Sequence, residues 1–353
     1  MNQPNSNPSI RAVRRKRLAA SPDGLISANT WPQLGNLPMV VEAKVPGLRL
    51  SAWAEGRRAQ IEAWLDRHAA VLFRGFAVDG VADFERCVDV LAGGAEEYKF
   101  RASPRTQVGN NIYTATDYPA DQSIFPHNEH SYSPICPLEL VFYAEIPSRS
   151  GGETPIGDTR EVMRRIDPAI IERFVRKGIL YVRNYGAGFG LPWRKVFQTG
   201  EREKVERYCA ELGIRCEWKS GDRLRTRQVG PAVVRHPRNG EPVWFNHGTF
   251  FHVTTLPPAI RDALLAEFDE DDLPQNTYYG DGSPIESEVL EQLRAAYQES
   301  MVDFGWQQGD VMLVDNILSV HARRPYTGFR RVLVAMARLF RTADHTVIRE
   351  PWL

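Results

Sequence analysis

The chain has 353 residues, of which 42% are hydrophobic, so it can bury a sizeable core as one large domain or two small ones. Basic and acidic residues number 44 each, which leaves no overall field to attract nucleic acid or an anionic membrane surface. The sequence contains no apolar run of about 18 residues that predicts a membrane span. Its four scattered cysteines are typical of free thiols in a reducing cytoplasm. We therefore expect a cytoplasmic protein that binds neither nucleic acid nor membrane.

The first 30 residues are predicted to form a flexible basic arm. Polar residues are followed by the basic stretch 11–17, and no apolar segment of a secretory signal comes after it. A localisation or nucleic-acid-binding arm is the alternative interpretation of this stretch. Residues 31–353 are expected to form a single domain, with a helical insertion at around 185–300.

Helices are predicted early in the chain and again in its second half. Residues 55–70 place Ile61, Trp64 and Leu65 on one helical stripe, and residues 81–91 carry a similar stripe. Asp158 and Ser283 each precede an acidic residue by three positions, which predicts a helix N-cap at both. The second of these helices should run to about residue 300.

Strand-like runs are short and are separated by turns rich in glycine and proline. They cover residues 70–73, 138–144, 232–235, 311–314 and 331–340. This order favours a mainly β fold with helical buttressing (α+β), of the β-sandwich or jelly-roll kind, over a parallel α/β sheet.

A histidine and a carboxylate lie two residues apart at His127 and Glu129, so on a strand they would share one face. A further histidine, His321, follows an apolar run and a turn. Two imidazoles and one carboxylate would hold iron(II) and leave coordination positions open for a 2-oxo acid and O₂. The alternatives are a chance pairing and a zinc hydrolase, which the lack of H-E-x-x-H spacing disfavours.

An arginine pair, Arg330 and Arg331, follows His321 at the start of an apolar strand. A guanidinium that projects into a barrel can bind the far carboxylate of 2-oxoglutarate through two parallel hydrogen bonds. A surface basic pair ahead of a core strand is the structural alternative.

The chain resembles the taurine dioxygenase and clavaminate synthase-like family of iron(II)/2-oxoglutarate oxygenases over roughly residues 70–340. The segments that carry the resemblance are 71–76, 113–119, 126–129, 151–155, 315–321 and 330–331. The resemblance implies a double-stranded β-helix, with His127, Glu129 and His321 as iron ligands. It also implies that Thr154 and Arg331 contact 2-oxoglutarate, because the second arginine of the family's pair has that role.

The resemblance also narrows the reaction. Halogenating members lack the carboxylate that Glu129 supplies, so we expect a hydroxylase. Sulfonate-oxidising members carry an arginine four residues after the 2-oxoglutarate arginine, where this chain has Ala335. Residues 184–247 resemble relatives found beside non-ribosomal peptide synthetases. We therefore expect hydroxylation of a small substrate, an amino acid that is free or tethered to a peptidyl carrier protein, in antibiotic or other secondary-metabolite biosynthesis.

Two alternative functions stay open at this stage: a catabolic oxygenase of a sulfonate, ether or quaternary amine, and a non-catalytic barrel used for binding or regulation. The substrate's identity, the position of oxidation and the oligomeric state are not predicted. Candidate substrate contacts are Asn110, Asn111, Arg225, Arg227 and Asn246, with surface salt bridges as the alternative role of the two arginines. His247 and His252 are expected to be packed and hydrogen-bonded rather than metal-bound.

Overall fold

The computed structural model describes residues 24–97, 105–186 and 191–346. Most of the predicted basic arm, residues 1–23, lies outside these ranges. The end of that arm is not flexible chain: Ile26–Thr30 form strand β1, which pairs antiparallel with β2, Met39–Ala43. The folded part therefore begins before residue 31, earlier than the sequence indicated.

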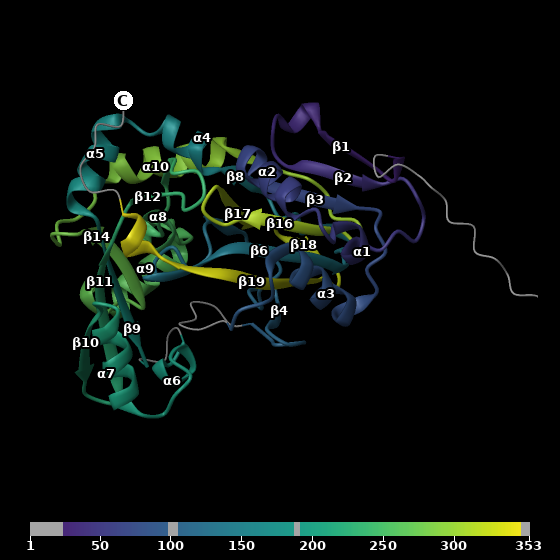
Figure 1. Cartoon of the computed structure of the whole chain (residues 1–353). Helices are drawn as coiled ribbons and strands as arrows, with labels where there is room; N and C mark the ends of the chain where they lie inside the picture. Colours follow the sequence, from purple (N-terminus) through teal and green to yellow (C-terminus); the bar gives the residue numbers. More distant parts are fainter. Residues whose placement is uncertain (1–23, 98–104, 187–190, 347–353) are drawn as a thin grey trace, which may run out of the picture.

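A seven-stranded sheet with the strand order β1-β2-β3-β16-β6-β19-β4 forms the centre of the protein (Figure 1). Among the strands of this sheet, as far as the described residues show, β2 and β3 are the one parallel pair. Four of the five strands predicted from the sequence belong to this sheet. Its remaining strands span β3 Ala70–Arg74, β4 Ile112–Thr114, β6 Ile135–Ile146, β16 Val311–Asp315 and β19 Arg331–Arg341.

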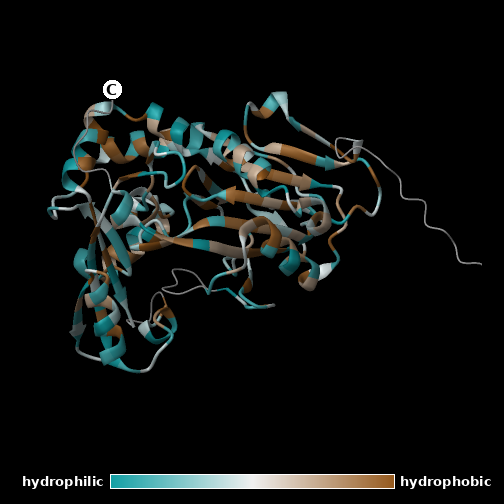
Figure 2. Ribbon diagram, in the orientation of Figure 1, coloured by the Kyte–Doolittle hydropathy of each residue, from teal (hydrophilic) through white to brown (hydrophobic). Residues whose placement is uncertain are grey.

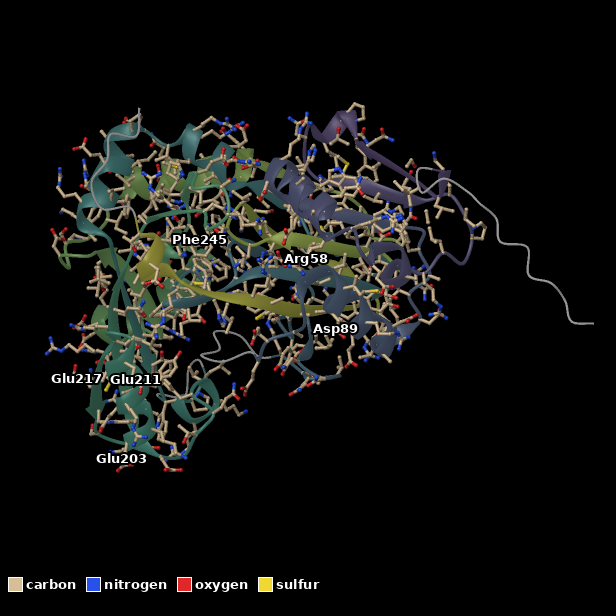
Figure 3. The ribbon with its side chains drawn as sticks, in the orientation of Figure 1. Arg58, Asp89, Glu203, Glu211, Glu217 and Phe245 are labelled. Atoms are coloured by element: carbon tan, nitrogen blue, oxygen red, sulfur yellow. The ribbon has the colours of Figure 1, made fainter. Side chains whose placement is uncertain are left out.

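Three helices cover one face of this sheet: α1 Leu50–Ala54, α2 Arg58–His68 and α3 Gly80–Ala92. Both early helical predictions are thus confirmed. Arg58 of α2 lies above the central sheet (Figure 3), with Nη2 3.6 Å from Oε2 of the buried Glu139. Hydrophobic residues concentrate along the central strands (Figure 2), because alternate side chains face the helices on one side and a second core on the other.

A four-stranded sheet with the order β15-β8-β17-β5 lies against the other face. Ile156 of β8 and the residues that precede β17 share one buried cluster with β6, β16 and β19. This second sheet contains β5 Ile124–His127, β8 Ile156–Asp158, β15 Met301–Val302 and β17 Ser319–Arg323, and β7 Ser150–Gly151 pairs with β18 Tyr326–Thr327 nearby.

Of the two predicted N-caps, the first is confirmed. Helix α4 spans Thr159–Arg165, and the Asp158 carboxylate accepts a hydrogen bond from the backbone N–H of Arg160. The second is wrong, because Ser283 instead donates its backbone N–H and its hydroxyl to the Asp281 carboxylate in a turn. Helix α10 begins later and spans Ser287–Glu299.

The segment expected to be a helical insertion contains strands as well. A four-stranded sheet with the order β10-β11-β9-β14 and the hairpin β12–β13 lie among its helices. Glu203, Glu211 and Glu217 lie at the outer end of this unit, away from the central sheet (Figure 3). The strands span β9 Ile179–Tyr185, β10 Arg215–Lys219, β11 Arg223–Gly230, β12 Val233–Arg235, β13 Pro242–Trp244 and β14 Gln275–Tyr279; the helices span α5 Pro168–Lys177, α6 Trp193–Val196, α7 Arg202–Glu211, α8 Gly248–Phe251 and α9 Pro258–Glu267.

Within the described ranges, no helix combines the length and apolar character needed to cross a membrane.

Candidate metal centre

The three side chains predicted to bind metal meet in the second sheet. His127 ends β5, Glu129 follows two residues later, and His321 stands in the middle of β17. The antiparallel pairing of β5 with β17 places His321 opposite His127, and their ring centroids lie 4.4 Å apart. One ligand atom from each of the three residues lies within 4.8 Å of the others. A single metal ion fits this spacing.

The His127 ring is oriented by its neighbours. Its Nδ1 lies 2.8 Å from the carbonyl oxygen of Phe125 and can only donate there, so Nε2 remains available to a metal. The ring stacks on Phe250 of α8 with centroids 4.7 Å apart. On the opposite strand, Nε2 of His321 lies 4.0 Å from Oε2 of Glu129, and the His321 ring packs against Phe142.

The protonation states suit metal binding. Burial lowers the pKa of both His127 and His321, which keeps the two imidazoles neutral near pH 7. Burial alone would raise the pKa of Glu129, but the opposing charge of the Arg105 guanidinium outweighs it, and the pKa is lowered to about 2. The site therefore offers two neutral nitrogens and one carboxylate, the ligand set of non-haem iron(II) oxygenases.

Arg105 also belongs to this site, although no sequence pattern predicted it. Its Nη2 donates to Oε2 of Glu129 at 2.6 Å, and its side chain is only 6% exposed. The residue stands 24 positions before Glu129, in a segment without periodicity. The only sequence signal was its place just ahead of the family-like segment that begins at Tyr113.

Thr154 and an arginine meet beside the triad, but the arginine is Arg330. The buried Thr154 hydroxyl accepts from Trp306 Nε1 at 3.0 Å and lies 3.4 Å from Nη2 of Arg330. Nε of Arg330 donates to the carbonyl oxygen of Gly152, and burial lowers the pKa of Arg330 to about 10. Thr154 stands two residues before Ile156, the β8 partner of His321.

Arg331, the arginine predicted to contact 2-oxoglutarate, points to the other side of the strand from Thr154. Its Nε forms an ion pair with Glu145 at 2.8 Å, and its side chain is 36% exposed. Successive side chains along β19 point to opposite sides of the sheet, which explains the difference. Val332 and Val334 face the buried cluster that contains Phe142, and Arg330, two positions before Val332, is on the same side. Sulfonate-oxidising members carry an arginine four residues after the 2-oxoglutarate arginine. Counted from Arg330, that position is Val334 rather than Ala335, and both residues are apolar.

Four of the five predicted substrate side chains bond to other parts of the fold, and the substrate role of all five stays a prediction. Arg225 pairs with Asp272, and Arg227 with Asp271. The side-chain amides of two asparagines bond to backbone groups, that of Asn246 to Ala232 and Gly248 and that of Asn111 to Ala95. Asn110 is exposed, and its backbone N–H donates to the Glu85 carboxylate.

His247 and His252 are packed and hydrogen-bonded, as expected. His247 Nδ1 lies 2.6 Å from the hydroxyl of Ser131, and its ring meets His127 edge-on. His252 Nδ1 contacts Thr254. Neither histidine belongs to the three-residue metal group.

A second group with metal-like spacing, Asp66, His236 and Asp315, is an ion-pair network. The guanidinium of Arg238 bonds to both carboxylates of this group. A cation is therefore already in place there.

The sequence matches the family described as taurine catabolism dioxygenase TauD, TfdA family over residues 33–337. It is 41% identical over 276 residues to the dapdiamide synthesis protein DdaC of Enterobacter agglomerans, covering 78% of this chain and 84% of that protein. It is also 30% identical over 316 residues to a clavaminate synthase-like protein of Arabidopsis thaliana, covering 85% of this chain and 92% of the relative.

Solved structures with a similar fold include PvcB of Pseudomonas aeruginosa, at a TM-score of 0.53 and 17% identity over 93% of this chain and 96% of that one. A dioxygenase of Burkholderia xenovorans, described as a putative alpha-ketoglutarate-dependent taurine dioxygenase, matches at 0.53 and 16% identity over 92% and 98% of the two chains. At such identities the similarity concerns the fold.

Proposed function

The chain belongs to the TauD/TfdA dioxygenase family, and from this premise we propose that it is an iron(II)- and 2-oxoglutarate-dependent hydroxylase of a small, amino-acid-derived substrate in secondary-metabolite biosynthesis. The observation that carries the proposal is the convergence of His127, Glu129 and His321 on one point. Thr154 and Arg330 stand beside this trio, on the connection into β8 and ahead of β19.

The donor set fits both implied groups. Two neutral imidazoles and a single carboxylate suit iron(II) and leave part of its coordination sphere to small molecules. The Arg330 guanidinium and the Thr154 hydroxyl can both donate to a carboxylate. We therefore propose that they hold the far carboxylate of 2-oxoglutarate.

When bound, iron(II) would allow O₂ to act as the oxidant: one oxygen atom would enter succinate as 2-oxoglutarate is oxidised to succinate and CO₂, and the other would enter the substrate as a hydroxyl group. The chain's own residues position the groups and exclude water. The carbonyl of Phe125 fixes the His127 ring through Nδ1, and Arg105 holds one oxygen of Glu129. The ring of Phe250 packs on His127 and the ring of Phe142 packs on His321. This apolar surface limits the access of water to the metal site and so limits side reactions there.

Two features support hydroxylation of an amino-acid-derived substrate. Glu129 supplies the carboxylate that halogenating members lack, and the sulfonate-arginine position is apolar. The 41% identity to a protein of dapdiamide synthesis supports a role in biosynthesis. We propose a substrate that is either free or held on a peptidyl carrier protein, and a cytoplasmic location.

We also propose that the two facing sheets form a double-stranded β-helix, or jelly roll, within a single oxygenase domain. Supporting this, the seven-stranded and four-stranded sheets share one buried cluster between them. In this arrangement the metal centre lies on the smaller sheet.

The proposal is tested by measuring succinate formation with iron(II), 2-oxoglutarate and O₂. The test panel contains free amino acids, the same amino acids loaded on a carrier protein, and sulfonates. We expect substrate-dependent succinate with an amino acid and none with His127→Ala. Stimulation by sulfonates alone would contradict the proposed substrate class, and no succinate under any condition would contradict the proposed activity.

A further inference from the structure

We infer that Asn316 is a positioning residue that sets the place of the metal ligand Glu129, and that its side-chain amide is required for tight metal binding. The inference rests on the proposed function, because it takes Glu129 to be a ligand. It concerns a residue that contacts the backbone of Glu129 and not the metal.

Asn316 is fully buried in the turn between β16 and β17. Its Oδ1 accepts the backbone N–H of Glu129 at 2.7 Å, and its Nδ2 donates to the carbonyl oxygen of Glu129 at 2.9 Å. The same Nδ2 donates to the carbonyl oxygen of Pro137 at 2.8 Å. One amide thus satisfies both backbone polar groups of the carboxylate ligand.

Glu129 needs such support because it lies outside the sheet. His127 and His321 face each other across the β5–β17 ladder, which fixes their backbones. Strand β5 ends at His127, and the chain turns at His130, where φ is 58°. The backbones of two of the three ligands are therefore held by strand pairing, and the backbone of the third is held by the Asn316 side chain.

The contact is reciprocal. Nδ2 of Asn128 donates to the carbonyl oxygen of Asn316 at 2.7 Å and to that of Ser319 at 3.2 Å. Ser319 begins β17, the strand that carries His321. The two asparagines consequently join the segment of Glu129 to the segment of His321, although 187 positions separate Asn316 from Glu129.

The turn that presents Asn316 is itself fixed. Oδ1 of Asp315 accepts the backbone N–H groups of Ile317 and Leu318 at 2.9 and 3.0 Å. The Thr159 hydroxyl donates to the carbonyl oxygen of Ile317. Because the turn is held from both sides, the Asn316 amide has a defined place from which to orient Glu129.

The test compares Co(II) binding to Asn316→Ala and to the wild-type chain, by calorimetry and by the visible absorption of the bound ion. Asn276→Ala is the matched control, since Asn276 is also buried and its Oδ1 also accepts a backbone N–H, that of Val253. We expect Asn316→Ala to lower the Co(II) affinity by about 10- to 100-fold and to alter the absorption of the bound ion. Asn276→Ala should stay close to wild type in both.

A second variant keeps the inference testable if Asn316→Ala does not fold. Asn128→Ala removes the reciprocal donors and leaves the Asn316 amide in place, so it should lower Co(II) affinity in the same direction by a smaller factor. Wild-type Co(II) affinity and absorption in every folded variant of Asn316 and Asn128 would overturn the inference. A wild-type chain that binds no Co(II), or binds it equally after His127→Ala, would instead overturn the proposed metal centre on which it rests.

Discussion

Arg330 donates its Nε proton to the carbonyl oxygen of Gly152 at 3.0 Å, and this bond directs the guanidinium toward Thr154. The adjacent Arg331 turns to the opposite side and pairs with Glu145. Two neighbouring arginines thus have separate contacts, so substitutions can test them one at a time.

Arg330→Met should weaken 2-oxoglutarate binding, and Arg331→Met should not. A charge-assisted hydrogen bond contributes about 1.5–3 kcal/mol, so the loss at Arg330 corresponds to about 10- to 100-fold in the dissociation constant. The constant is measured anaerobically with iron(II) and increasing 2-oxoglutarate. Equal effects of the two substitutions, or a larger effect at Arg331, would contradict the placement of the arginine.

Gly152→Ala should disturb the 2-oxoglutarate site by a steric clash with the Arg330 side chain. A Cβ at Gly152 would lie 2.5 Å from the Ser148 hydroxyl oxygen and 3.0 Å from Cδ of Arg330. Gly56 has the same φ of +73° and nothing within 4 Å, so Gly56→Ala is a matched control for backbone strain. Both variants should lose about 1–2 kcal/mol of unfolding free energy from the left-handed backbone. Only Gly152→Ala should also raise the 2-oxoglutarate dissociation constant.

The stability of the metal-free protein should fall as the pH drops below about 6.5. Burial lowers the pKa of His252 to about 4, so this ring stays neutral in the fold while the unfolded chain takes up a proton near pH 6.5. The unfolded state then binds more protons, and the folded state is relatively destabilised at lower pH. Urea unfolding at pH 7.5 and 5.5 measures this loss.

His252→Gln isolates the contribution of that ring. The loss of unfolding free energy between pH 7.5 and 5.5 should be about 1 kcal/mol smaller in this variant than in wild type. Burial also lowers the pKa of His130 to about 4, so part of the pH dependence should remain. An unchanged pH dependence in His252→Gln would show that the ring is not held neutral by burial.

The grouping of His127, Glu129 and His321 could be predicted from the sequence because each stands in a recognisable local pattern. His127 and Glu129 lie two residues apart, and His321 follows a recognisable strand and turn. The choice between Arg330 and Arg331 could not be made this way. Residues 332–337 of β19 are buried on both faces of the sheet, so their continuous apolar run does not show whether the odd-numbered or the even-numbered side chains face the site.

The features that were missed depend on contacts between distant segments. Arg105 reaches Glu129 from a loop, and Asn316 reaches it from the far end of the chain. Strand β11 of the predicted helical insertion was not predicted, because Arg223, Arg225 and Arg227 interrupt any apolar run. Arg225 and Arg227 are neutralised by Asp271 and Asp272 of the connection before β14, which local sequence patterns do not reveal.

The central claim is that His127, Glu129 and His321 bind iron(II) together with 2-oxoglutarate, and anaerobic titration tests it most directly. Wild type and His252→Gln, which changes a histidine outside the metal group, should both develop the visible charge-transfer band of an iron(II)-bound 2-oxo acid. His321→Ala should develop none. No band in the wild-type chain, or an undiminished band in His321→Ala, would contradict the account.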